Sequence, residues 1–176
     1  SMLYLLLRIR QFLSTHMRRL FFNAYILPHL DYCCTIWGNC SDTLTNKLYK
    51  FQKRAARIIL DQPYDAPSHN LFQELKWMKF HDRIIYKKAT FVYKSLNNIF
   101  PEYMSNLFKE SDNISLRSHS NHALCVPKPR LEFCRKSLAY SGPVIWNNIP
   151  LNIRQSNSLI AFKRLYLSWF YSGGQT

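Results

Sequence analysis

Residues 41–60, SDTLTNKLYKFQKRAARIIL, carry two parallel stripes of side chains that decide how the rest of the chain is interpreted. Apolar side chains recur at steps of three and four residues, which is the period of one buried helix face. They are Leu44, Leu48, Phe51, Ala55 and Ile58. Ser41 or Asp42 can cap the first turn, because a side-chain oxygen there accepts a free backbone N–H. We therefore predict a helix over residues 43–60.

A cationic stripe runs beside the apolar one. Its members recur at steps of three, four and three residues, with one further lysine widening the stripe and no acid interrupting it; they are Lys47, Lys50, Arg54, Arg57 and Lys53. A helix face that is merely solvated usually mixes acids with bases, because opposite charges four residues apart stabilise it. A purely cationic side favours the binding of phosphates, and a solvated face is the alternative.

Charge is distributed unevenly along the 176 residues, whose formal net charge is +14. Residues 1–60 hold nine basic and two acidic groups (net +7), residues 61–110 seven and six (net +1), and residues 111–176 eight and two (net +6). Two basic ends flanking a nearly neutral middle favour a polyanionic partner, either nucleic acid or an anionic membrane surface.

Several other classes are disfavoured by the composition. No apolar run approaches the length of a membrane span, and no terminal helix has a wide basic face, so no membrane partner is expected. The five cysteines form no CxxC pair, which indicates reduced thiols of an intracellular protein of the nucleus or cytoplasm. Only four glycines argue against a phosphate-cradling glycine loop, and we expect no cofactor.

The fold predicted from these patterns is mainly α, a helical bundle with a short extended or β segment near residues 123–133. Further helices are predicted over residues 3–15, 17–37 (kinked near Pro28), 68–76, 81–97, 101–108, 137–148 and 158–171. The polar, turn-rich residues 111–120 suggest a boundary between a helical domain, 1–110, and a C-terminal segment packed on it, 111–176.

Catalytic and metal-binding alternatives carry weaker signals. His119, His122, Cys125 and Cys134 are the residue types that bind zinc, but their spacing matches no strong finger pattern, and we expect no metal site. The pairs His29–Asp31 and His81–Asp82 suggest acid–base chemistry only if neighbours in sequence face each other, which helices rarely allow. We interpret them as surface residues and expect no catalytic group.

Small and aromatic side chains are expected mainly in the core. Cys33 and Cys34 fall inside a predicted buried helix, where a free cysteine acts as a small hydrophobe. Trp37, Trp77 and Trp146 stand beside leucine and isoleucine at helical spacing, and we predict that they pack in the core rather than stack on bases.

Seven motifs follow one another along the chain: LFFNAYILPHLDYCCTIWG (20–38), KLYKFQKRAARII (47–59), LFQELKWMKFHDRIIYKKATFVYKSLNNIFPEYMSNLF (71–108), SLR (115–117), VPKPR (126–130), SLAYSGPVIWNNIP (137–150) and FKRLYLSWF (162–170). Their order resembles the C-terminal region of reverse transcriptases from non-LTR retrotransposons, the LINE elements of the Jockey-like group. Together the motifs cover most of the chain, and the ordered series is more specific than any single motif.

The resemblance implies the polymerase thumb and the segment after it, without the palm, its catalytic aspartates or an endonuclease. Such a chain is expected not to polymerise or cut alone, but to grip RNA, an RNA–DNA hybrid or a DNA duplex. By position, the basic helix would hold phosphates with Lys47, Lys50, Lys53, Arg54 and Arg57. A second contact set would be Arg117, Lys128, Arg130, Arg135 and Lys136.

A protein-interaction module is the main alternative to the nucleic-acid hypothesis. A thumb separated from its palm exposes a face that was covered, and large apolar patches seldom stay bare. Apolar residues of the N-terminal region, which include Leu5, Leu6, Phe12, Phe21 and Phe22, would then pair two chains or bind a partner protein. A third hypothesis, a nuclease that uses the His–Cys loop, predicts stoichiometric metal.

Overall fold

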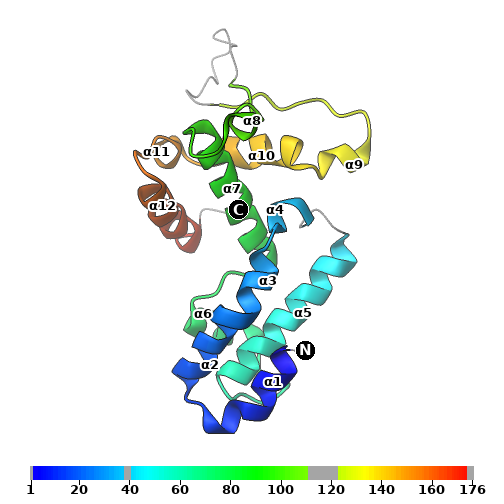
Figure 1. The fold of residues 1–176 in the computed structure, drawn as a ribbon, viewed down its shortest axis with the longest axis vertical. Helices are drawn as coiled ribbons and strands as arrows, with labels where there is room; N and C mark the ends of the chain where they lie inside the picture. Colours follow the sequence, from blue (N-terminus) through cyan, green and yellow to red (C-terminus); the bar gives the residue numbers. More distant parts are fainter. Residues whose placement is uncertain (1, 38–40, 111–122, 174–176) are drawn as a thin grey trace. The chain divides into compact units, whose positions relative to one another are not determined.

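The computed structural model describes residues 2–37, 41–110 and 123–173, and its architecture is mainly α, as predicted (Figure 1). The elements in chain order are α1 (Met2–Ile9), the 3-10 helix η1 (Arg10–Phe12), α2 (Thr15–Phe21), the π-helix η2 (Phe22–Ile26), α3 (Leu27–Asp31), α4 (Cys34–Trp37), α5 (Asp42–Ile59), α6 (Ser68–Leu75), α7 (Phe80–Leu96), α8 (Glu102–Ser105), α9 (Glu132–Arg135), α10 (Leu138–Asn147), α11 (Leu151–Arg154) and α12 (Leu159–Tyr171).

Proline and turn chemistry divide the first 37 residues into short helices. The predicted kink appears as the π-helix η2, in which the Leu27 N–H donates to the Phe22 carbonyl. Pro28 has no N–H and its ring crowds the preceding turn, so a locally widened turn accommodates it. α3 then ends where Cys33 adopts a positive φ of 49°. Cys33 is exposed and only Cys34 is buried, so the prediction that both lie in a buried helix is wrong for Cys33.

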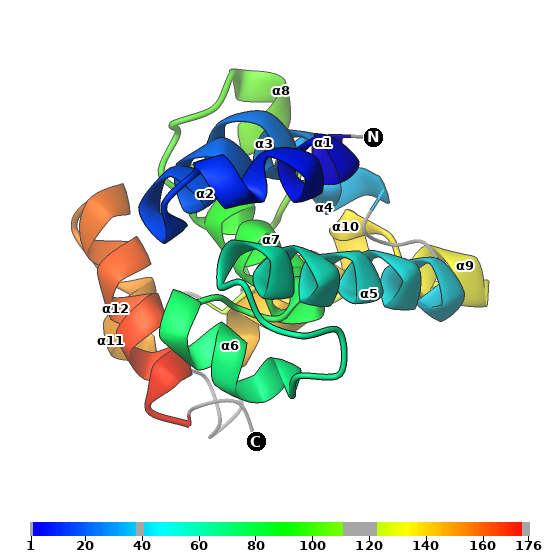
Figure 2. The ribbon, with the colours of Figure 1, turned by 90° about the horizontal axis from the view of Figure 1, so that it is seen from below.

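The chain divides into two compact units, Ser1–Ile84 and Ile85–Thr176. In the first unit, α5 packs against α6 on one side and against α1 and α2 on the other (Figures 1 and 2). Ala55 and Ala56 are fully buried, and their small side chains let the neighbouring helices approach α5 closely. Around them packs a core of Leu3, Leu6, Phe22, Ile26, Ile58, Ile59, Ala66, Leu71, Phe72 and Leu75.

A buried arginine and an ion pair add specific links within the first unit. Arg18, which is only 8% exposed, donates to the carbonyls of Arg10 and Leu13 at 3.0 Å and of Ile59 at 3.2 Å. It thereby satisfies the Ile59 carbonyl at the end of α5, where carbonyls lack intrahelical partners, and adds a second donor to the Arg10 carbonyl, which also accepts the Leu13 N–H. Asp31 and Arg83 form a bidentate ion pair, with both N–O distances 2.7 Å, that links α3 to α7.

The second unit is built around a cluster of aromatic rings. Tyr93 of α7 stacks on Phe162 of α12 with ring centroids 4.5 Å apart, and Trp146 of α10 lies 6.0 Å from the same ring. Gly142 lets α10 pack closely against its neighbours, because a Cβ there would lie 2.9 Å from the ring of Phe108 and 3.2 Å from the side chain of Val92 in α7. Trp146 is therefore a core residue as predicted. Trp77 is partly buried against the core of the first unit, and the side chain of Trp37 lies outside the described residues.

The predicted extended segment near residues 123–133 is represented by one isolated bridge at Leu124. Leu124 forms an isolated antiparallel bridge with Glu110, and its N–H and carbonyl each bond to the Asn147 side-chain amide at 2.9 Å. Residues 130–133 are not extended, because α9 begins at Glu132. No named strand occurs in the described ranges. The predicted domain boundary after residue 110 remains a prediction, since residues 111–122 lie outside those ranges.

Candidate nucleic-acid interface

Helix α5 spans 18 residues and carries both predicted stripes. The members of each stripe differ in how deeply they are buried. Ala55 and Ile58 of the apolar stripe are buried, and Leu48 and Phe51 are partly buried. Leu44 is 48% exposed, so the prediction that it belongs to the buried face is wrong within the first unit. The first turn of α5 begins at Ser41. The Ser41 carbonyl accepts the N–H groups of Leu44 and Thr45, but the Ser41 side chain forms no capping hydrogen bond.

Gln52 is a polar residue on the buried side of α5 and is not a member of the predicted apolar stripe. Its side-chain nitrogen donates to the Met78 carbonyl at 2.8 Å, which links α5 to the chain just before α7. Because this polar side chain faces inward, the cationic residues at positions 47, 50, 53, 54 and 57 remain on the other side of the helix. Within the predicted cationic stripe, Lys47, Lys50 and Arg54 are exposed.

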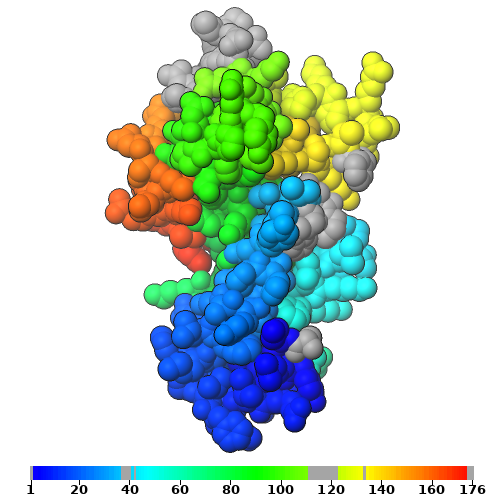
Figure 3. Space-filling view, in the orientation of Figure 1, coloured from blue at the N-terminus to red at the C-terminus, as the bar shows by residue number. Residues whose placement is uncertain are grey.

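Four of the five cations of α5 keep their charge uncompensated within the described part of the chain. Lys47, Lys50, Lys53 and Arg54 form no ion pair there. The Lys53 ammonium lies 4.2 Å above the centroid of the Tyr49 ring, a cation–π contact that orients the amine without neutralising it. Cations without an ion-pair partner along one helix create a positive potential that attracts phosphates. The surface of α5 is visible as the cyan area of Figure 3.

Arg57 differs from the other four because the protein holds its guanidinium. Nε and one Nη donate to the Ala66 carbonyl at 3.0 and 2.8 Å. The guanidinium carbon also lies 5.7 Å from the centroid of the Tyr64 ring. Arg57 therefore fixes the turn after α5.

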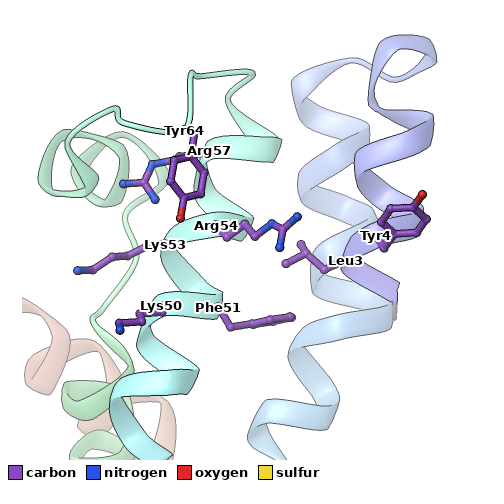
Figure 4. A pocket seen from close by; sticks show the side chains of 8 residues that line it. All are labelled: Leu3, Tyr4, Lys50, Phe51, Lys53, Arg54, Arg57 and Tyr64. Carbon is purple, nitrogen blue, oxygen red and sulfur yellow. The ribbon is translucent and has the colours of Figure 1, made fainter. Parts of the chain in front are cut away.

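A groove of about 700 Å³ brings part of the cationic stripe together with aromatic and apolar side chains. We call it the α5 groove; its lining residues are Leu3, Tyr4, Lys50, Phe51, Lys53, Arg54, Arg57 and Tyr64. Figure 4 shows Lys50 and Lys53 extending to one side of α5, and Arg54 and Phe51 extending towards Leu3 of α1. Lys47 does not line the groove. The arrangement can hold an anion and a planar or apolar group at the same time.

The two tyrosines of the α5 groove were not predicted as site residues. Tyr64 lies in the sequence DQPYDAPS after α5, and Tyr4 lies among leucines near the start of the chain. The available signal was the position of Tyr64 between two prolines, where an aromatic ring has no helix or strand to pack against. Tyr4 could not have been placed, because its neighbourhood depends on how α1 packs on α5.

The second predicted cationic set lies in the second unit and is less ordered by contacts. We call residues 128–136 the cationic segment. Lys128, Arg130 and Lys136 are exposed, and Arg135 pairs with Glu132 at 3.4 Å, with both side chains more than half exposed. Arg117 lies outside the described residues. The role of these residues in binding stays a prediction.

The alternative metal and acid–base sites are not assembled in the described residues. His119 and His122 fall outside them, Cys125 and Cys134 are exposed, and no group of three or more metal-binding side chains occurs in ranges 2–37, 41–110 and 123–173. Asp31 is paired with Arg83 rather than free on the surface. Burial raises the pKa of the Asp82 carboxyl, against the opposing effect of the Lys79 and His81 charges, but no partner places it in a site.

The N-terminal apolar surface is smaller than predicted. Leu6 and Phe22 are buried in the core, so the prediction that they are available to a partner is wrong; helix packing turns them inward. Phe21 is partly buried, whereas Leu5 is 45% and Phe12 78% exposed.

Comparison with known proteins adds no relative. No protein-family model, curated protein or solved structure matches this chain. Within the part that the structure describes, no helix combines the length and apolar character needed to cross a bilayer. Functional inference therefore depends on the residues of the α5 groove and on the order of the sequence motifs.

Proposed function

We propose that this protein binds nucleic acid without catalysing a reaction, and that it is a thumb-like part of a non-LTR retrotransposon reverse transcriptase or derives from one. The observation that carries the proposal is the row of uncompensated cations along α5, Lys47, Lys50, Lys53 and Arg54. The motif series that resembles those enzymes supports the same role. In this proposal the cations grip the phosphates of duplex or element RNA.

The length of the cationic row suits a nucleic-acid backbone. Positions 47 to 57 span roughly 15 Å along the axis at the rise of an α-helix. One strand of B-form DNA carries a phosphate about every 3.4 Å of its axis, so about four phosphates fit along that length. Contacts to phosphates carry no base sequence, and we therefore expect weak sequence preference.

The test is a salt titration of binding with wild type and with the variant K47Q/K50Q/K53Q/R54Q. Fluorescence anisotropy would measure Kd for matched RNA duplex, DNA duplex, RNA–DNA hybrid and single strands. Four phosphate contacts predict that wild-type affinity for DNA duplex falls on the order of 100-fold between 50 and 200 mM salt. The variant should lose most of this dependence. Arg57 is left unchanged, because it anchors the turn and its loss would confound binding with folding.

Two results would contradict the proposal. Wild type that barely binds any of the four ligands at 50 mM salt would remove the function itself. A variant with the same affinity and salt slope as wild type would show that the cations of α5 form a solvated face. Equal melting curves of the two proteins by circular dichroism are the control for folding.

A protein-interaction role is the second candidate, favoured by the exposure of Phe12. A phenylalanine 78% exposed at the end of a short helix is unusual enough to suggest an apolar contact with a second copy or a partner. Sedimentation across a 100-fold concentration range would detect self-association, and the F12S variant should abolish it. A concentration-independent monomer would exclude the homodimer.

A further inference from the structure

Tyr64 is held in an exposed position by the turn that follows α5. Tyr64 is 85% exposed, although hydrogen bonds fix the backbone around it. The Gln62 N–H donates to the Arg57 carbonyl at 2.9 Å, and the Ala66 N–H donates to the Pro63 carbonyl at 3.2 Å. Ala66 itself is buried in the core of the first unit. The ring is thus presented to solvent by an anchored turn.

Arg57 supports this ring from behind. Its guanidinium is fixed by two hydrogen bonds to the Ala66 carbonyl, and its carbon lies 5.7 Å from the centroid of the Tyr64 ring. Figure 4 shows the guanidinium and the ring side by side at the end of the α5 groove. One face of the ring meets the cation, and the high exposure of the residue leaves another aromatic face accessible.

The cations that line the same groove are placed to bind phosphates. Lys50, Lys53 and Arg54 are within one turn of each other on α5, form no ion pair among the described residues, and precede Arg57 along the helix. The nearest acid in sequence after α5, Asp61, lies 3.5 Å from Arg10 and 3.7 Å from Arg18, so its charge is compensated. The groove therefore places cations and an exposed aromatic ring within reach of consecutive nucleotides.

We infer that the α5 groove binds unpaired nucleotides, with a base stacked on Tyr64 and the adjoining phosphates on Lys50, Lys53 and Arg54. This rests on the proposed nucleic-acid binding and narrows its ligand to a single strand or a single-stranded overhang. Every base has a π face, so stacking on an aromatic ring requires no particular sequence. In a duplex the bases already stack on one another, and a ring at the surface cannot reach their faces.

The expected energetic signature separates stacking from charge. Alanine substitution of a stacking aromatic residue typically costs about 1–3 kcal/mol per base, which corresponds to roughly 5- to 150-fold in Kd. Tyr64 carries no charge that neutralises a phosphate, so its removal should leave the salt slope unchanged. Substitution of the groove lysines should instead reduce that slope.

The experiment compares four proteins on two ligands of equal phosphate number. The proteins are wild type, Y64A, Y64F and the control Y103A, in which a tyrosine of the second unit that is 73% exposed is removed. The ligands are a single-stranded oligothymidylate and a blunt-ended DNA hairpin closed by a non-nucleotide linker, which has no unpaired base. We expect Y64A to weaken binding of the single strand by 5-fold or more, whereas Y64F and Y103A bind like wild type. Hairpin affinity should be the same for all four.

The outcomes distinguish failure of this inference from failure of the proposed function. If wild type binds the hairpin with a steep salt slope but Y64A binds the single strand as wild type does, only the stacking inference is overturned. If Y64A weakens both ligands equally, Tyr64 acts through the fold and the inference is again overturned. If wild type binds neither ligand, both proposals fall.

A second measurement locates the base directly. A single strand carrying 5-iodouracil should crosslink on irradiation to an aromatic side chain that stacks on it, and mass spectrometry of the peptide should place the adduct on Tyr64. Adducts confined to peptides of the second unit would overturn the assignment.

Discussion

The two cationic regions of this protein differ less in charge than in the surroundings of that charge. The α5 groove has its lysines and arginines on one regular helix, beside Tyr64 and Phe51, and above a packed core. The cationic segment, residues 128–136, places its side chains on extended chain and on the four-residue helix α9. A charge on a fixed frame loses less freedom when it binds a phosphate, so equal charges need not contribute equally.

The largest expected difference is between matched variants of the cationic stripe of α5 and of the cationic segment. K47Q/K50Q/K53Q/R54Q and K128Q/R130Q/R135Q/K136Q each remove four positive charges. Four lost phosphate contacts should lower duplex affinity on the order of 10³-fold near 0.1 M salt for the first variant. We expect less than 10-fold for the second, as measured by anisotropy. Equal losses would show that the frame is irrelevant and that only net charge matters.

A smaller effect is expected from weakening the frame without changing the charge. R57K keeps the cation but cannot form the two-pronged contact with the Ala66 carbonyl. We expect the free energy of unfolding to fall by about 1–2 kcal/mol, measured by urea denaturation, because one charged hydrogen bond is lost. R54K is the matched control and should be as stable as wild type. If R57K changed the salt dependence of nucleic-acid binding but not the free energy of unfolding, Arg57 would contact phosphate directly.

The smallest effect concerns the ion pair of the cationic segment. Glu132 lies 3.4 Å from Arg135 and both side chains are exposed. Such surface pairs contribute about 0–1 kcal/mol, so E132Q should leave the melting temperature nearly unchanged. It should raise nucleic-acid affinity by about twofold to fivefold at low salt, because Arg135 becomes available. No gain in E132Q would indicate that the segment does not contact the ligand.

Much of α5 could be predicted from local chemistry, whereas the predicted helices 3–15 and 17–37 are divided into shorter elements. The helix expected over residues 43–60 occupies Asp42–Ile59, because the period of three and four persists through Ile58 and a turn follows. The distortion before Pro28 was predictable, since it depends only on a missing N–H and a local clash. α10 and α12 also lie close to the predicted ranges.

What sequence could not supply was the set of contacts between distant segments. Arg18 would be placed on the surface by its charge, yet it is buried because carbonyls from three positions converge on it. Arg57 appeared equivalent to Arg54 in the stripe, but the returning turn brings the Ala66 carbonyl to it. Phe22 was expected on a surface available to a partner, and helix packing buries it. Each case depends on tertiary geometry that no local period encodes.

The pairing of Leu124 with Asn147 makes a single side chain responsible for holding a buried backbone position. The side-chain amide of Asn147 takes the place of a neighbouring strand, and the bridge to Glu110 fixes positions 110 and 124 opposite each other. Because Leu124 is buried, replacing Asn147 by alanine would leave the Leu124 N–H and carbonyl without that partner. A substitution in α10 would therefore be felt at a residue more than twenty positions earlier in the chain.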